Sequence, residues 1–406
     1  MKTGIQALEL LDPRLRGDDD HCKKNMPTKN YAKLSLTLHK KLRGKISIAA
    51  KTKINNREDL SLVYTPGVGA VSSAIAKDEE LADVMTWRKN AVAIVSDGSA
   101  VLGLGNIGAS AALPVMEGKS AIFKRFTDID AVPLVLATQD PDEIVRIVQA
   151  LEPSFGAIQL EDISAPRCFE IEERLSKTLN VPVMHDDQHG TAIVVLAGIL
   201  NALKVTRRTA KASVSIIVNG AGAAGVAIAK LLTAAGFKHV IVCDRQGAIF
   251  AGRPGMNPSK VALASFTNPG KKSGQLSEVI QGADVFVGVS GPGLLSPEMV
   301  KSMAPKSIVF GLANPIPEIM PDLAKAAGAA IVASGRSDMP NQLNNALVYP
   351  GLFRGMLDKG VKQVDDRIKL RAALALSGFV KKPTAEKIIP SIFDKGLHQA
   401  IARSVK

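Results

Sequence analysis

Residues 213–244 read SVSIIVNGAGAAGVAIAKLLTAAGFKHVIVCD. The β-branched run 213–218 leads into a glycine-rich turn, an uninterrupted apolar segment follows that turn, and Asp244 ends the next apolar run. In a strand–turn–helix unit such glycines permit a tight turn and a close backbone approach, and the helix N-terminus presents partial positive charge to a pyrophosphate. The stretch therefore predicts a Rossmann-type site for NAD or NADP, formed by Gly220, Gly222, Ala223, Ala224, Gly225 and Asp244.

The residues after the second strand leave the choice between the two cofactors open. Asp244 would accept hydrogen bonds from the adenosine ribose hydroxyls, which favours NAD. Arg245 follows immediately and could instead pair with a 2′-phosphate.

The same GxGxxG spacing occurs earlier, at 103–108, and both copies have an aspartate about 20 residues further on, so the bare motif is weak support. Pro114 follows the earlier copy closely and is expected to interrupt a helix there. Its aspartate, Asp128, is expected past the end of a strand. We therefore interpret 103–108 as a tight loop that brings backbone close to a ligand or to another domain.

In both the N-terminal and the C-terminal half of the sequence, apolar runs alternate with helical patterns. This alternation predicts an α/β fold with parallel sheets. Before residue 188 the predicted strands are 91–95, 120–126, 132–137, 155–160 and 181–185, with helices at 141–151 and 168–179. After it the predicted strands are 213–218, 239–244, 283–289, 307–313 and 329–333, and the Gly-, Pro- and Lys-rich segment 245–276 is a predicted surface loop.

We expect four parts along the chain: a tail at 1–30, an N-terminal substrate and metal domain at 31–187, a dinucleotide-binding domain with a doubly wound parallel sheet at 188–360, and C-terminal helices at 361–406 that pack back on both. The start is charged, lacks the apolar segment of a signal peptide and has a second methionine at Met26. An amphipathic helix is expected near 33–46. The apolar stretch 190–205 is expected to be a helix too short or interrupted for a membrane span of about 20 residues.

Composition limits the classes of function. The chain has 406 residues, 46% apolar and 22% charged, which excludes a disordered or fibrous protein. Its net charge of +13 favours anionic partners, but aromatic residues make up only 4% and do not alternate with basic ones, so we expect small anionic ligands rather than nucleic acid. Three cysteines are no disulfide framework; Cys168 and Cys243 are expected to pack in the core of a reduced, cytoplasmic protein.

Two pairs of acidic residues end predicted strands. Glu161–Asp162 follows FGAIQL, and Asp186–Asp187 follows VPVMH. The carboxyl ends of parallel strands line the ligand crevice, so these pairs can converge. Clustered carboxylates favour Mg²⁺ or Mn²⁺ over zinc or copper, whereas the alternative, that each pair caps a helix, leaves one acid of each pair unexplained. His185 and His189 are expected to form hydrogen bonds rather than to bind metal.

Two further segments contain candidate functional residues, a tyrosine and a lysine. LSLVYTPGVG contains Tyr64, and LPVMEGKSAIF contains Lys119, which would lie just before a strand; taken alone they would be a core or turn tyrosine and a surface lysine. Together with the other motifs they resemble the malic enzymes, in particular the short bacterial form, over most of the chain from about residue 42 to 380. The shared segments, in the family's order, are REDLSLVYTPGV, VLGLGNIG, LPVMEGK, FKRFTDIDAVP, QLEDI, HDDQHGTA, VNGAGAAG, GLANPIPEI and GRSDMPNQLNNALVYPG.

The resemblance implies a metal-dependent oxidative decarboxylation of L-malate to pyruvate and CO₂ with reduction of NAD(P)⁺, in a homo-oligomer that is at least a dimer. It implies that Lys119 is the general base, that Tyr64 is the general acid, and that Asp186 orients or tunes Lys119. To act as a base, Lys119 needs a depressed pKa. The remaining implied roles are metal ligands for Glu161, Asp162 and Asp187, and substrate or nicotinamide contacts for Asn314 and Asn345.

One departure concerns the second carboxylate of malate. Eukaryotic members carry an arginine just before the GLGxxG loop, whereas residues 99–102 here, Ser-Ala-Val-Leu, contain no cation. The sequence therefore does not identify the group that binds this carboxylate. Two alternatives remain. One is a metal-free NAD-linked hydroxy-acid or amino-acid dehydrogenase, whose activity would not respond to chelators. The other is a non-catalytic dinucleotide sensor or nucleic-acid-binding regulator, which would retain DNA or RNA in a salt-sensitive manner. We expect no membrane partner.

Overall fold

The computed structural model describes residues 30–406, and the chain divides into two units with the boundary after Gly44. The described part of the first unit is α1 (Tyr31–Leu42), capped by Asn30, whose side chain accepts a hydrogen bond from the Lys33 amide at 3.0 Å. The helix predicted near 33–46 is confirmed, although none of its residues is buried. The predicted tail, with Cys22 and Met26, lies almost entirely outside the described residues.

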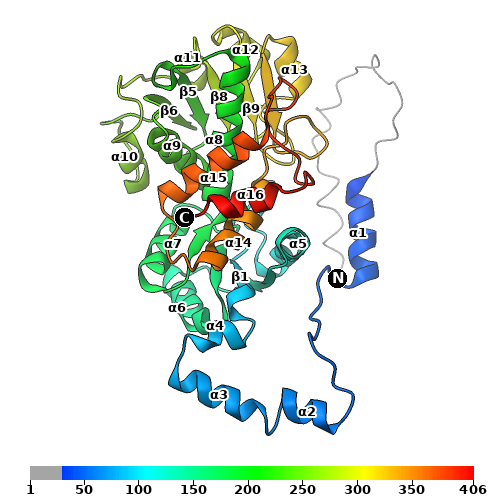
Figure 1. Ribbon diagram of the computed structural model, residues 1–406. Helices are drawn as coiled ribbons and strands as arrows, with labels where there is room; N and C mark the ends of the chain where they lie inside the picture. Colours follow the sequence, from blue (N-terminus) through cyan, green and yellow to red (C-terminus); the bar gives the residue numbers. More distant parts are fainter. Residues whose placement is uncertain (1–29) are drawn as a thin grey trace, which may run out of the picture. The chain divides into compact units, whose positions relative to one another are not determined.

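The second unit, 45–406, contains two parallel sheets (Figure 1). The first has the order β2-β1-β3-β4, and every neighbouring pair is parallel. Its strands are β1 (Ala91–Ser96), β2 (Asp130–Val135), β3 (Ala157–Leu160) and β4 (Val183–His185). The helices that precede and connect its strands along the chain are α2 (Arg57–Val63), α3 (Val68–Lys77), α4 (Leu81–Met85), α5 (Ala109–Thr127), α6 (Pro141–Leu151) and α7 (Arg167–Thr178).

Helix α5 corrects two predictions. Residues 120–126 are helical rather than a strand, and Pro114 lies inside the helix without ending it. The buried residues of α5 are Ala112, Met116, Ser120 and Phe123, so one face at helical spacing packs inward. This tertiary burial outweighs the cost of Pro114 and the β-like appearance of SAIFKRF. Asp128 consequently follows a helix, in left-handed conformation (φ 54°), and not a strand.

The second sheet has the order β10-β9-β8-β5-β6-β7, in which only the short β7 is antiparallel. Its strands are β5 (Ser215–Asn219), β6 (His239–Asp244), β7 (Gly247–Ala248), β8 (Val285–Gly288), β9 (Ile308–Gly311) and β10 (Ile331–Ser334). The chain runs outward from β5 first through β6 and then through β8, β9 and β10. This is the doubly wound arrangement, with its switch point between β5 and β8.

Every strand predicted for the second sheet is confirmed, but the predicted loop 245–276 is partly wrong. It contains β7 and the helix α10 (Pro258–Ala264), which Asn257 caps by accepting from the Lys260 amide at 2.9 Å. A cap followed by proline at the first helical position is a strong helix start. The other helices here are α8 (Asp186–Thr206), α9 (Ala223–Ala234), α11 (Leu276–Val279), α12 (Pro297–Ser302) and α13 (Pro321–Ala326).

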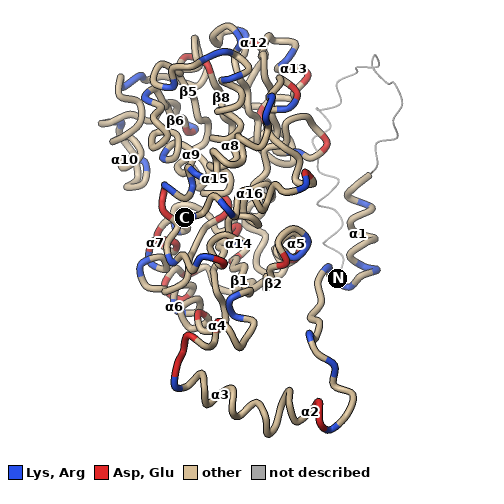
Figure 2. Tube along the Cα trace, viewed as in Figure 1, with Lys and Arg blue, Asp and Glu red and all other residues tan. Residues whose placement is uncertain are grey.

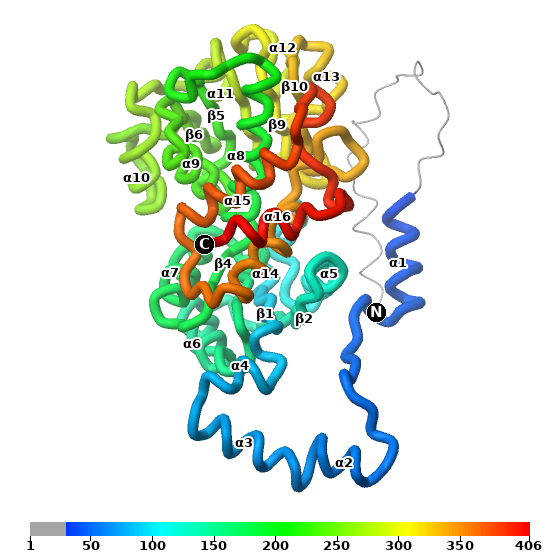
Figure 3. Tube along the Cα trace, viewed as in Figure 1, coloured from blue at the N-terminus to red at the C-terminus, as the bar shows by residue number. Residues whose placement is uncertain are grey.

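Three C-terminal helices lie against both sheet regions (Figure 3): α14 (Tyr349–Lys359), α15 (Asp366–Phe379) and α16 (Leu397–Ser404). One hydrophobic cluster contains residues of β1, α8, β5 and all three of these helices. The predicted boundary at 187/188 falls inside α8 and stays a prediction. Short 3₁₀ turns complete the chain at Arg88–Asn90, Leu102–Leu104, Glu152–Ser154, Lys211–Ser213 and Asn345–Leu347.

Helix α8 is the longest apolar element of the described residues. The helix has 21 residues and is long and apolar enough to cross a membrane by length and composition alone, so the expectation that its apolar stretch is too short or interrupted to span one stays a prediction. However, 78% of its most apolar window is buried inside the protein, which is what the core helix of a soluble fold also shows. Lys and Arg residues are distributed over many elements of the described chain rather than gathered in one strip (Figure 2).

His398 on α16 makes stability depend on pH. Its ring is buried, with 4% of the residue exposed, and lies 4.9 Å from the Phe126 ring, centroid to centroid. Burial lowers the pKa of His398 from 6.5 to about 4. Between these pH values the unfolded chain binds a proton that the folded chain does not, so the free energy of unfolding falls as pH drops from 6.5 to 4, by up to about 3 kcal/mol.

We therefore expect His398→Phe to show a weaker fall of unfolding free energy between pH 6.5 and pH 4 than the unsubstituted protein, measured by urea unfolding at several pH values. The exposed His239 offers a matched control, since His239→Phe removes an imidazole that loses little solvent on folding. Equal pH slopes for the His398 variant and the parent would contradict the assignment.

Candidate active site

The two acidic pairs lie side by side at the carboxyl edge of the first sheet. Strands β3 and β4 are hydrogen-bonded neighbours, with Leu160 paired to His185, so the residues that follow each strand emerge together. Carboxylate oxygens of Glu161, Asp162 and Asp187 all lie within 4.8 Å of one another. The Asp162 amide also donates to Asp187 Oδ2 at 2.8 Å, which ties the two pairs together.

The capping alternative does not hold. The N-cap of α8 is His185, whose side chain makes no capping hydrogen bond, and α7 begins after Pro166, which also caps nothing. Glu161 and Asp162 are 2% and 4% exposed, a burial that single carboxylates rarely have without a partner of opposite charge. Burial and the nearby Asp187 carboxylate raise the pKa of Glu161 well above its ordinary value. Such a cluster of oxygen ligands fits a divalent cation of the Mg²⁺ or Mn²⁺ type.

Lys119 belongs to this cluster. Its Nζ lies 2.5 Å from Asp186 Oδ2 and 2.9 Å from Glu161 Oε1, and only 11% of its side chain is exposed. Both expectations about its setting were wrong: it is no surface lysine, and it lies on helix α5. Burial alone would lower the pKa of Lys119, but the Asp186 and Glu161 carboxylates outweigh burial and raise it well above 10.5. With these carboxylates free to pair, the amine is held charged, which is the opposite of the depressed pKa expected for a base.

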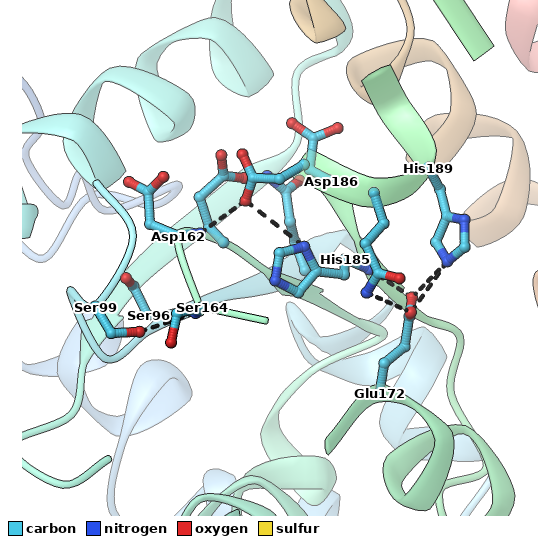
Figure 4. A network of polar contacts seen from close by, with 12 residues as sticks. Ser96, Ser99, Asp162, Ser164, Glu172, His185, Asp186 and His189 are labelled. Atoms are coloured by element: carbon cyan, nitrogen blue, oxygen red, sulfur yellow. Dashed lines mark hydrogen bonds and ion pairs between the residues drawn. The ribbon is translucent and has the colours of Figure 1, made fainter. Parts of the chain in front are cut away.

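Several residues that sequence reasoning missed hold the carboxylates in place. Gln159 on β3 donates to Glu161 Oε2 at 2.7 Å. At Gly190 an added Cβ would lie 2.0 Å from Asp186 Oδ1, so only glycine permits the observed position of that carboxylate. The loop after β1 is joined to the loop after β3, because the Ser164 amide donates to Ser99 Oγ at 2.9 Å (Figure 4).

Glu172 on α7 fixes the turn from β4 into α8 (Figure 4). It accepts from the His185 amide at 2.7 Å and from Gln188 Nε2 at 3.0 Å, and it lies 3.0 Å from His189 Nε2. Burial would raise the pKa of Glu172, but His189 and His185 lower it to about 2. The His189 ring therefore bonds a carboxylate, as expected, whereas the prediction was wrong for His185, whose ring nitrogens have no hydrogen-bond partner among the described residues, Nδ1 lying 3.6 Å from Asp187 Oδ2. Neither histidine belongs to the group of three that could hold a metal.

The glycine-rich turn after β5 fits a pyrophosphate. An added Cβ at Gly225 would lie 1.8 Å from Gly220 O, and one at Gly220, which has φ 129°, would lie 2.6 Å from Val289 O. A Cβ at Gly222 would meet nothing within 4 Å. Helix α9 starts at Ala223 without any side-chain cap, so its first amides are available to a ligand on the open side.

The earlier GxGxxG copy is a loop, as interpreted, but for a different reason. Helix α5 does begin directly after Gly108, so Pro114 does not separate the two copies. What separates them is the preceding strand: β5 ends at Asn219, beside Gly220, whereas β1 ends well before Gly103. An added Cβ at Gly103 would lie 2.0 Å from Asn314 O, so this loop packs against the loop after β9.

A cavity of about 590 Å³ lies between the two sheets and receives residues from both. The helices and loops next to the first sheet contribute Lys119, Glu161, Asp162 and Asp187. Those next to the second sheet contribute Ala224, Asn314 and Asn345. A larger cavity of about 980 Å³ beside α4 contains none of the predicted site residues. Among the described residues lining the cavity between the sheets, Lys119 is the only cation, so the cavity offers no arginine for the second carboxylate of the substrate that the resemblance implies.

Two of the three tyrosines differ in their relation to this cavity. Tyr64, which follows α2, is 66% exposed and does not line this cavity. Tyr349 does line it, is fully buried, and has Lys119 Nζ 4.6 Å from its ring centroid. Its hydroxyl has no hydrogen-bond partner among the described residues, and burial raises its pKa well above 10.0. Tyr349 stands in the shared segment QLNNALVYPG, but no local pattern distinguishes it from a core residue.

Comparison with known proteins agrees with this geometry. The model of the malic enzyme N-terminal domain matches residues 43–176, and the model of the malic enzyme NAD-binding domain matches residues 188–405. The bifunctional malic/malolactic enzyme of Bacillus subtilis (strain 168) is 50% identical over 374 residues, 91% of each chain. The NADP-dependent malic enzyme of Escherichia coli (strain K12) is 47% identical over 87% of this chain, which spans only 47% of that protein.

Solved structures give the same assignment. The crystal structure of the NAD-dependent malic enzyme of Thermotoga maritima superposes with a TM-score of 0.89 at 49% identity, covering 92% of this chain and 98% of that one. The Entamoeba histolytica malic enzyme also reaches 0.89, at 37% identity, and covers 92% of this chain and 80% of that one. The chain therefore belongs to the malic enzyme family.

Proposed function

We propose that this malic enzyme converts L-malate to pyruvate and CO₂ in the cavity between the sheets, with reduction of NAD(P)⁺. The observation that carries the proposal is the placement of Lys119 Nζ at 2.9 Å from Glu161, beside Asp162 and Asp187, in a cavity that also receives Asn314 and Asn345. A base, a set of oxygen ligands and a dinucleotide turn thus face one space. The cysteines among the described residues, Cys168 and Cys243, are buried and unpaired, which supports a reducing, cytoplasmic location.

The carboxylate trio would hold Mg²⁺ or Mn²⁺, and the glycine turn with α9 would hold the dinucleotide. The chemistry that these groups would supply is polarisation of the C2 oxygen of malate by the dication and acceptance of hydride by the nicotinamide. Lys119 takes the proton from the C2 hydroxyl. For this the ammonium must first lose a proton, and the positive charge of a dication held by Glu161 would oppose the carboxylates that raise its pKa. Asn314 and Asn345 orient the substrate and the nicotinamide by their amides.

Tyr64 is the proposed donor of the proton that C3 receives after CO₂ leaves. In its own chain it lies outside the cavity, which fits a homo-oligomer in which a second copy supplies it. Helices α2 and α3, on either side of Tyr64, have no buried residue. Leu62 in this segment is 72% exposed, and Ile48 before it is 97% exposed. Such an apolar, uncovered segment is what a subunit interface provides.

Chelation is the direct test of the metal. We expect EDTA to abolish pyruvate formation from L-malate and Mn²⁺ to restore it, with either NAD⁺ or NADP⁺ as oxidant. Glu161→Gln should raise the Mn²⁺ concentration needed for half-maximal activity at least about 10-fold, because it removes a charged ligand. Direct Mn²⁺ binding by calorimetry provides a second readout.

The matched control is Glu173→Gln, which removes an exposed carboxylate of α7 that pairs with Lys177 at 2.5 Å. It should leave both measurements unchanged. Substrate turnover that persists in EDTA without CO₂ release would instead indicate the metal-free dehydrogenase. Salt-sensitive retention of DNA without malate turnover would indicate the sensor or regulator.

A further inference from the structure

The carboxyl end of β6 holds an ion cluster that bears on the choice between NAD⁺ and NADP⁺. Asp244, the last residue of β6, has both carboxylate oxygens engaged. Arg253 Nη1 donates to Oδ1 at 2.9 Å and Nη2 to Oδ2 at 2.5 Å, while Lys260 Nζ lies 2.7 Å from Oδ2. The Gln246 amide also donates to Oδ1 at 2.9 Å. The carboxylate is thus saturated by this chain's own donors, and its side chain is only 9% exposed.

This arrangement is poorly suited to the adenosine ribose of NAD⁺. A carboxylate at this position recognises the unmodified ribose by accepting hydrogen bonds from its hydroxyls. Asp244 could do so only by giving up part of a bidentate arginine pair, the strongest kind of charge-assisted hydrogen bond. Arg253 is firmly placed, with 7% of its side chain exposed and Nη1 also 3.3 Å from the Gly247 carbonyl oxygen on β7.

The same arrangement suits a phosphate. Asp244 contributes one negative charge, whereas Arg253 and Lys260 contribute two positive charges, so the cluster has a net positive charge. Lys260 on α10 keeps 28% of its side chain exposed, and Arg245, directly after β6, is exposed. Both can turn toward a ligand; Lys260 would then exchange its contact with Asp244, which Arg253 still pairs, for the ligand. Basic residues are visible in this part of the sheet (Figure 2).

We propose that this cluster selects NADP⁺ over NAD⁺: Arg253 holds Asp244 away from the ribose, and Lys260 and Arg245 bind the 2′-phosphate. The inference rests on the proposed function only in placing a dinucleotide at the turn after β5. Because β5 and β6 are paired, with Asn219 opposite Cys243, the end of β6 lies beside that turn.

Binding of adenosine fragments tests this without turnover. In phosphate-free buffer at fixed low salt, calorimetry on the full chain should find adenosine 2′,5′-bisphosphate at least about 10-fold tighter than 5′-AMP. Lys260→Gln should reduce this ratio several-fold by weakening only the bisphosphate, and Arg245→Gln should act in the same direction. The matched control is Lys238→Gln, which removes one positive charge just before the other end of β6 and should leave the ratio unchanged.

The outcomes separate the two proposals. Equal affinity for the two fragments, or tighter binding of 5′-AMP, would overturn the inference and leave the proposed function intact. The inference would also be overturned if Lys238→Gln lowered the ratio of the two affinities as much as Lys260→Gln does. The preference for the bisphosphate would then come from the overall positive charge of the protein. If neither fragment bound at all, the dinucleotide site itself would fail, and the inference with it.

Discussion

Lys119→Arg is expected to lower kcat for malate oxidation by about 10²- to 10⁴-fold, the usual contribution of a general base. Arginine keeps the positive charge that pairs with Asp186 at 2.5 Å and with Glu161 at 2.9 Å, so the buried carboxylates stay compensated. It cannot release a proton in the accessible pH range. The substitution therefore separates proton transfer from charge pairing. Cofactor binding, measured by calorimetry, should be unchanged.

Lys119→Ala removes both proton transfer and charge pairing, and it should be less stable than the unsubstituted protein. It leaves Glu161 and Asp186 buried without their cation, which is expected to cost about 3–5 kcal/mol in the free energy of unfolding. Adding Mn²⁺ should recover part of this loss, because the dication compensates the same carboxylates. Urea unfolding with and without Mn²⁺ measures both effects.

Lys124→Arg is the matched control for the kinetic experiment. Lys124 lies on the same helix α5, pairs with Asp128 and Asp130, and is 54% exposed. Its replacement should change kcat little. A Lys119→Arg enzyme that kept more than about a tenth of the parent's kcat would remove Lys119 as the base.

The dinucleotide half could be predicted from sequence because its determinants are local. Strand β5, the turn Gly220–Gly225, helix α9 and strand β6 follow one another without interruption, and each has its own pattern. The convergence of Glu161 with Asp187 was also predictable, since it needs only that two parallel strands lie side by side.

The lysine end of the site was not predictable from residue pattern alone. Lys119 enters the cavity because α5 continues through Pro114, and that helix exists because Phe123 and Met116 pack inward. Phe123 in turn packs edge-on against Tyr349, at 4.8 Å, so a residue more than 200 positions away shapes this end of the site. Such long-range packing leaves no signal in a local window.

The ion cluster at Asp244 was hidden for a similar reason. The pattern after β6 predicts a carboxylate for the ribose, but Arg253 and Lys260 lie in a segment whose composition indicated only a loop. They reach Asp244 because β7 turns the chain back beside β6 and Asn257 starts α10 there. The carboxylate at the end of β6 could therefore be predicted from the sequence, but the two cations that decide its role could not.

Mixing two inactive variants is expected to restore activity, because Tyr64 and Lys119 would come from different copies. Tyr64→Phe lacks the proton donor and Lys119→Arg lacks the base, so each alone should be nearly inactive. In a heterodimer, one cavity combines the intact Lys119 of one chain with the intact Tyr64 of the other. Random pairing makes half of the dimers mixed, each with one complete site, so the mixture should reach about a quarter of the parent's activity.

The experiment requires the variants to be co-expressed, or unfolded and refolded together, and activity is compared with the same chains refolded separately. No activity above the separate samples would mean that both residues act within one chain, and the exposed Tyr64 segment would then have to fold onto its own cavity. High activity of Tyr64→Phe by itself would remove Tyr64 as donor. Tyr349→Phe distinguishes that case, since Tyr349 is the tyrosine already beside Lys119, with its ring centroid 4.6 Å from Nζ. Loss of activity in Tyr349→Phe, together with an active Tyr64→Phe, would assign the proton to the cavity's own tyrosine and leave the exposed segment with a purely structural role between subunits.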